Sequence, residues 1–130
     1  MATDDFVLAE APVEHRAREL WMQHAAGFIL FQDVREYARS NIRADLPAVA
    51  RDAALKAIDD ALYGLMMVAD GVTGALRSGT RYLHVRVNVR HQDGGRILDE
   101  IDFFDGDGAC MGFHGWKDGD FGEHPVVQGT

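Results

Sequence analysis

The chain has 130 residues, a net charge of −8, and contents of 47% hydrophobic and 26% charged residues, which are typical of one ordinary globular domain. No apolar run approaches the roughly 20 residues that span a bilayer, and the acidic start carries no basic region before an apolar core. We therefore expect neither a membrane span nor a secretory signal. The single cysteine, Cys110, allows no internal disulfide, which favours a reducing, cytoplasmic location.

Acidic residues are concentrated at the C-terminal end. From Asp99 onward the sequence has eight acids and one base, Lys117, so the last 32 residues carry −7, whereas the other 98 residues carry 13 acids and 12 bases. Such a segment repels phosphates and anionic lipid heads, so we expect no nucleic-acid or membrane partner. It indicates either a surface for a basic partner protein or a cation, or turns whose acids serve solubility alone.

Two long helices are predicted, over about residues 12–40 and 46–70. The first has bulky side chains on one face, and the second has small ones, which predicts an antiparallel pair with large residues packed into a small face. The bulky set is Trp21, Phe28 and Phe31, and the small set is Ala50, Ala54, Ala57, Ala61 and Gly64. Leu55, Met66 and Met67 fall outside that face and require a further cover, so we expect a homodimer.

A β-hairpin follows the helices. Residues 81–90 alternate apolar and polar side chains, as a half-buried strand does, and a second strand is predicted at 96–104. With residues 93–95 as the loop, Val87 lies opposite Ile101 and Arg86 opposite Asp102, whereas a slip by one residue sets carboxylates against valines.

These elements predict an α+β fold, with two long antiparallel helices packed on a small antiparallel sheet. A third strand is possible at 109–113. We expect a single domain over residues 1–130, with an N-terminal arm at 1–11 and a glycine-rich acidic tail at 105–130 that packs on the core.

The tail begins with "FDGDGACMGFHGW", which fails as an EF-hand because its fifth, sixth and twelfth positions lack the required residues. Cys110, His114 and His124 are zinc-ligand types without a close second pair, so no metal or cofactor is predicted. A catalytic Cys110 with His114 or His84 as its base is a weaker alternative. The simplest interpretation is a series of turns held on the core by Phe113, Trp116 and Phe121.

Two hypotheses for function follow. The first is a non-catalytic soluble binding protein whose acidic C-terminal lobe meets a basic partner, comparable in size and charge alone to small inhibitor or immunity proteins. The second is a small-molecule or metal site between the tail and the hairpin, which includes the case of a small enzyme, against the plain alternative of a hydrated sheet face. The candidate ligand-binding residues are His84, Arg86, Glu100, Asp102, Asp105, Asp107, Cys110, His114 and Trp116.

His24 lies outside both the tail and the hairpin. It lies in the apolar stripe of the first helix, where a histidine is either a hydrogen-bonded core residue or part of a site.

Overall fold

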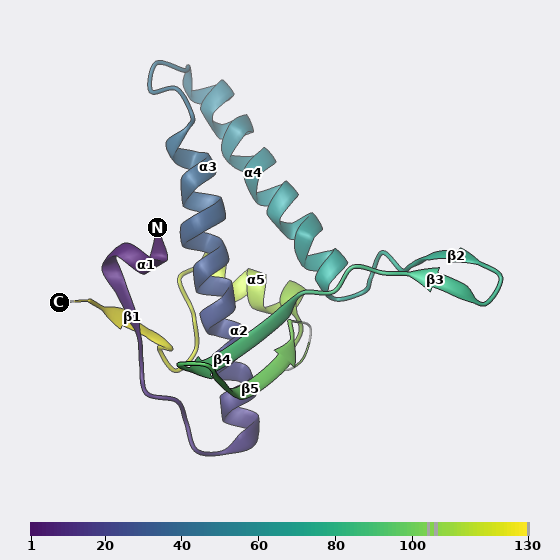
Figure 1. Ribbon diagram of the computed structural model, residues 1–130. Coiled ribbons are helices and arrows are strands. Elements are labelled where there is room, and N and C mark those ends of the chain that lie inside the picture. The colour runs from purple at the N-terminus through teal and green to yellow at the C-terminus, as the bar shows by residue number, and fades with distance from the viewer. Residues whose placement is uncertain (104, 106, 130) are drawn as a thin grey trace.

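The structure is a computed structural model that describes residues 1–103, 105 and 107–129 (Figure 1). In this part of the chain, helices combine with two-stranded antiparallel sheets, which confirms the predicted α+β class. A third helix, α5, adds to the two that the sequence predicts. No described helix is both long enough and apolar enough to cross a membrane.

The first helical stretch consists of α2 (His15–Leu30), the π-helical turn η1 (Phe31–Arg35) and α3 (Glu36–Ser40). Glu14 caps its start, because the carboxylate oxygens accept hydrogen bonds from the backbone N–H of Arg16 at 3.0 Å and of Ala17 at 2.7 Å. Those two bonds hold the pKa of the Glu14 carboxyl below its usual value. The helix thus begins about one turn later than predicted.

The antiparallel partner helix is α4 (Ala48–Ala69), but its packing differs from the prediction. The two helices are joined at their far ends and diverge toward the body of the molecule (Figure 1). Ala50, Ala57 and Ala61 are therefore exposed, and α4 instead buries Leu62, Met66 and Ala69. Since Met66 is 0% exposed, it is no longer a reason to expect a homodimer.

Helix α5 (Ala109–Lys117) occupies the region where a third strand at 109–113 was predicted, so that prediction is wrong. Ala109, Gly112, Phe113 and Trp116 are all buried, and their spacing is that of one helix face. The helix packs against both α2 and α4. Its side chains fill the space between the diverging helices, which is why a glycine-rich segment becomes part of the core.

The main core cluster is formed by η1, α4, α5 and the residue that follows β5. Its buried members are Phe31, Leu62, Met66, Ala69, Phe103, Ala109, Phe113 and Trp116. Phe113 and Trp116 were predicted as anchors and are 3% and 1% exposed, which confirms that prediction. Gln23, also fully buried, donates from Nε2 to the carbonyl oxygens of Phe103 at 3.0 Å and Asp105 at 2.6 Å, and so ties α2 to the chain after the hairpin.

The hairpin consists of β4 (Asn88–Asp93) and β5 (Arg96–Asp102) in a register two residues from the predicted one. Val89, not Val87, lies opposite Ile101, because the loop has two residues, Gly94 and Gly95, and a bulge follows between His91 and Gln92. A shift by two preserves the faces of both strands, so Val87, Val89, Ile101 and Phe103 still face inward. Leu83 and Val85, which the alternation also predicts to face inward, are instead exposed.

The predicted strand at 81–90 is interrupted. Its first part, β3 (Arg81–Leu83), pairs with β2 (Leu76–Ser78) in a separate hairpin that projects from the body (Figure 1).

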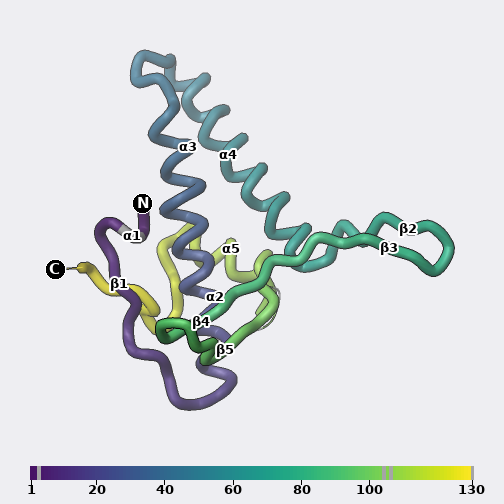
Figure 2. Tube along the Cα trace, viewed as in Figure 1, coloured from purple at the N-terminus to yellow at the C-terminus, as the bar shows by residue number. Residues whose placement is uncertain are grey.

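At the opposite end, β1 (Phe6–Leu8), which follows the short α1 (Ala2–Asp5), pairs with β6 (Val126–Gln128). This ladder places the N-terminal and C-terminal segments of the chain side by side (Figure 2).

Candidate functional site

The projecting hairpin is the most unusual surface feature, and we call residues 71–86 the finger. Every residue of the finger is exposed except Ala75, which is half-buried. Gly79, with φ of 61°, occupies the first position of the two-residue loop between Ser78 and Arg81, where a tight hairpin turn needs positive φ. The finger thus has the local geometry of a regular hairpin, and within the described part of the chain its two strands pair only with each other.

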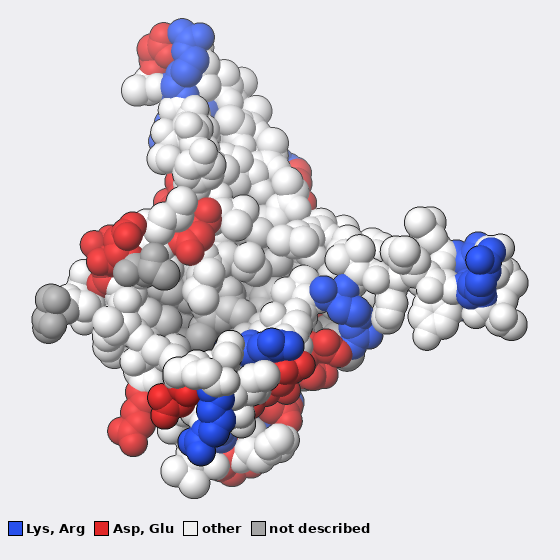
Figure 3. Space-filling view, in the orientation of Figure 1, with Lys and Arg blue, Asp and Glu red and all other residues white. Residues whose placement is uncertain are grey.

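The two faces of the finger differ in chemistry. One face carries the cross-strand pair Leu76 and Leu83, which are 79% and 64% exposed. The other face carries the pair Arg77 and Tyr82, with the guanidinium 5.1 Å from the centre of the ring. Basic side chains mark the tip of the finger in the space-filling view (Figure 3).

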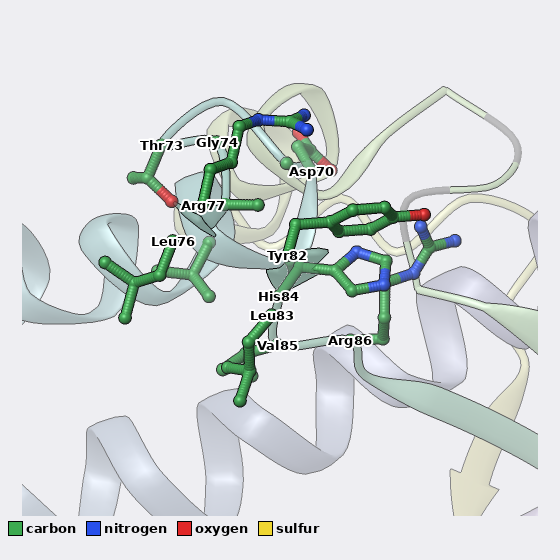
Figure 4. Close-up of a pocket in the computed structure, with 14 residues that line it drawn as sticks. Asp70, Thr73, Gly74, Leu76, Arg77, Tyr82, Leu83, His84, Val85 and Arg86 are labelled. Carbon is green, nitrogen blue, oxygen red and sulfur yellow. The ribbon is translucent and has the colours of Figure 1, made fainter. Parts of the chain in front are cut away.

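A cavity of about 550 Å³ lies at the base of the finger (Figure 4). Its polar lining includes Arg77, Tyr82, His84 and Arg86, which Figure 4 shows on one side of the opening. Asp70 also lines it, but its carboxylate is engaged: Oδ1 accepts from Ala109 N at 2.6 Å and Oδ2 from Cys110 N at 2.8 Å. Most of the lining is apolar, but its polar side includes two arginines and further hydrogen-bond donors, which suit a small anion.

Of the nine predicted ligand-binding residues, His84 and Arg86 line this cavity. Arg86 donates to the carboxylate of Asp102, whose backbone N–H in turn donates to Asp105 Oδ2 at 3.0 Å. Glu100 lies farther along β5, where it pairs with Arg90 at 3.0 Å. The carboxylates of these acids thus already pair with arginines of the hairpin or accept hydrogen bonds from the backbone.

The other predicted residues lie elsewhere. Asp107 pairs with Arg16 of α2 at 3.2 Å, and His114 is exposed with its ring 5.7 Å from that of Tyr63. Trp116 is buried in the core. The nine residues therefore form no common site, and among the described residues no group of three His, Cys, Asp or Glu side chains could hold a metal ion.

Cys110 is half-buried on α5. Burial raises the pKa of its thiol, and the nearby Asp70 carboxylate raises it further, while a hydrogen bond with Tyr63 acts in the opposite direction. A thiol with a raised pKa is a poor nucleophile at neutral pH, so this geometry does not support a catalytic Cys110.

A second cavity, of about 480 Å³, is an apolar groove between α2 and β4. On the β4 side its lining includes the consecutive residues 87–92, so the groove runs along the edge of the strand rather than over one face. The side chains that line it elsewhere are Leu8, Trp21, Met22, Ala25, Ala26, Ile29, Leu30 and Phe103. We call it the α2–β4 groove.

The sequence analysis missed both the finger and the groove. One signal for the finger was available, because residues 71–92 contain four arginines and no acid, in a chain with an excess of acids. The groove had no such signal, because its two walls come from segments about 60 residues apart. No protein-family model, curated protein or solved structure matches this chain.

Proposed function

We propose that the protein is a non-catalytic binding protein whose partners are other proteins. The finger is the observation that carries this proposal. It holds Val72, Leu76, Tyr82, Leu83 and Val85, each at least 58% exposed, on a projection whose two strands pair, among the described residues, only with each other. Apolar groups gathered on a projecting element are typical of interaction surfaces.

The proposal includes a basic partner for the acidic C-terminal segment, in a narrower form than the sequence suggests. The acids of β5 face arginines: Asp99 pairs with Arg18, and Asp102 with Arg86. Asp118, Asp120 and Glu123 are exposed, and no ion pair involves them in the described part of the chain. We therefore place the contact with a basic partner at residues 118–123.

Affinity capture from the host lysate tests the proposal when variants are compared. One variant carries Leu76→Ser and Leu83→Ser, a second carries Asp118→Asn, Asp120→Asn and Glu123→Gln, and a third is the control Val49→Ser, at an exposed position of α4. A specific partner is retained by the control and lost by at least one of the other two. Partners lost with the acidic variant should also dissociate as salt rises. Identical protein sets from all three variants contradict the proposal.

Two further parts of the proposal concern location and assembly. The single cysteine supports a cytoplasmic location. Self-association is supported by the exposed apolar residues of the finger rather than by Met66, which is buried.

The cavity at the base of the finger supports a second candidate function, the binding of a small anion. Its lining by Arg77, His84 and Arg86 is the observation that favours it. Phosphate, sulfate and citrate should then raise the melting temperature, and the double variant Arg77→Gln, His84→Gln should abolish that rise. No rise with any of the three anions argues against this candidate.

A further inference from the structure

We propose that the finger of a second copy of this chain binds in the α2–β4 groove. This inference rests on the proposed function, since it names a partner for the finger. Both surfaces belong to the same polypeptide and are apolar. The finger displays Leu76 and Leu83, and the groove is lined by the exposed Leu8 and Ile29 and by the buried Trp21 and Met22. A self-complementary pair of this kind produces a homodimer when the exchange is reciprocal.

The groove is suited to an extended segment. Strand β4 pairs only with β5, so its second edge carries backbone N–H and C=O groups that no strand of the described chain satisfies. The consecutive residues 87–92 place that edge along the groove. A strand that enters the groove can therefore hydrogen-bond to β4 while its side chains enter the apolar cavity.

The finger offers such a strand. Beyond β3 the chain continues through Val85, which lies two residues from Leu83 and hence on the same face of an extended segment. Leu76, across the ladder, is on that face as well. The groove volume of about 480 Å³ is within the range that accommodates apolar groups of this size.

Charge fixes the direction in which the finger enters. Arg81 is two residues before Leu83 on the same face, a distance of about 6.6 Å along a strand. Asp33 is not part of the groove lining, but it lies in η1 four residues after Ile29, about 6 Å farther along the helix, where it accepts a hydrogen bond from Ala2 N. With Leu83 beside Ile29, Arg81 therefore reaches Asp33.

The charges at the two ends of the groove agree with that direction. Asp5 of the adjacent α1 is exposed and adds negative charge at the Asp33 end. Arg81 takes part in no ion pair within the described residues, whereas Arg90, at the other end of the groove, already pairs with Glu100. The basic tip thus meets the acidic end.

Cysteine cross-linking tests the contact directly. In a Cys110→Ser background, one protein carries Leu83→Cys and another carries Ile29→Cys, and an equimolar mixture is oxidised in air. Both positions are at least half exposed, so the fold should tolerate them. We expect a disulfide-linked dimer of the two variants. Val49→Cys, which is 82% exposed on α4, replaces Ile29→Cys as the matched control and should cross-link far less.

Sedimentation of the unmodified chain provides the second measurement. We expect a dimer that Leu83→Asp weakens at least about tenfold and that Val49→Asp leaves unchanged. A monomeric wild type overturns the inference. So does equal cross-linking to Val49→Cys. In a further variant that carries both Leu83→Cys and Ile29→Cys, a disulfide within one chain also overturns it, because the finger then folds onto its own groove. A monomer that still captures a host protein through the finger overturns this inference alone and leaves the proposed function in place.

Discussion

Trp116 donates its indole N–H to Nδ1 of His24 at 2.9 Å, and so joins two side chains that lie 92 residues apart in the chain. The bond links α5 to α2 and requires an unprotonated Nδ1 on His24. Burial lowers the pKa of the His24 imidazole, although the charges of Asp120 and Asp107 act in the opposite direction. This histidine is thus a hydrogen-bonded core residue, the first of the two interpretations that its place in the apolar stripe allowed.

The lowered pKa of His24 predicts a pH-dependent stability. In the unfolded chain this imidazole titrates near about 6.5, and in the folded chain it titrates lower. Between those two pKa values the unfolded chain binds more protons than the folded chain. The contribution of His24 to the free energy of unfolding is therefore fully present above the pKa of the unfolded state, and it is lost as the pH falls through the pKa of the folded state. Urea unfolding midpoints measured from pH 8 to pH 5 should decrease accordingly.

The variant His24→Gln is the control for that prediction. Glutamine is neutral throughout this pH range, and its side-chain oxygen can accept the hydrogen bond from Trp116. The difference in unfolding free energy between wild type and variant isolates His24 from the other histidines. A difference that stays constant with pH contradicts the prediction.

The helices and the hairpin show which structural features the local spacing of apolar residues can predict. The two long helices were predictable because apolar residues recur in them at helical spacing. The alternation of apolar and polar residues likewise predicted the faces of the strand from Val87 onward, but not those of Leu83 and Val85, which are exposed. The register was not, because the bulge beside His91 adds a residue that no local rule reveals.

Helix α5 was missed for a different reason. Its first backbone N–H groups are capped by Asp70, 39 residues earlier, so the signal for its start is not local. The spacing of Ala109, Phe113 and Trp116 did fit a helix, but the glycines between them favoured turns. The core is too tight for a side chain at one of them, because a Cβ on Gly112 would lie 2.5 Å from Trp116.

Gly27 and Gly64 both lie inside helices, but substitution by alanine should have opposite effects on stability at the two positions, because the space around them differs. A Cβ at Gly27 would lie 2.4 Å from Trp116 Cε2, whereas one at Gly64 meets nothing within 4 Å. Gly27→Ala should destabilise the protein by about 1–3 kcal/mol through overpacking. Gly64→Ala should stabilise it by about 0.5–1 kcal/mol, because alanine favours the helix. Denaturant unfolding of both variants measures the two changes.

A double-mutant cycle checks the cause of the Gly27 effect. Trp116→Phe replaces the crowded indole with a smaller ring, so Gly27→Ala should cost less in that background than in the wild type. Equal costs in the two backgrounds would mean that Trp116 is not what opposes a side chain at position 27.

Asp59 and Asp60 are neighbours on α4, but they should contribute unequally to the stability of the fold. Asp59 accepts two hydrogen bonds from Arg35, at 2.7 and 3.0 Å, and these bonds lower the pKa of the Asp59 carboxyl. Arg35 as a whole is only 9% exposed. Asp59→Ala leaves the Arg35 guanidinium buried without its partner and should cost about 2–4 kcal/mol.

Asp60 provides the matched control. It pairs with Lys56 on the exposed side of the helix, so Asp60→Ala should change stability by less than about 0.5 kcal/mol. Thermal and denaturant unfolding of the two alanine variants compare them directly, and similar losses for both would contradict the assigned burial of the Arg35 pair.

The environment of Cys110 predicts slow alkylation. Burial and the Asp70 carboxylate both raise the pKa of the thiol, so the reactive thiolate is scarce at neutral pH. The rate of reaction with iodoacetamide should be well below that of free cysteine at pH 7.5, and its rise with pH should be shifted to higher pH. Asp70→Asn removes the negative charge while keeping an oxygen that can cap α5, so it should speed the reaction and shift the profile back. Fast alkylation of the wild type at pH 7 would instead indicate a stabilised thiolate and restore the case for a nucleophilic Cys110.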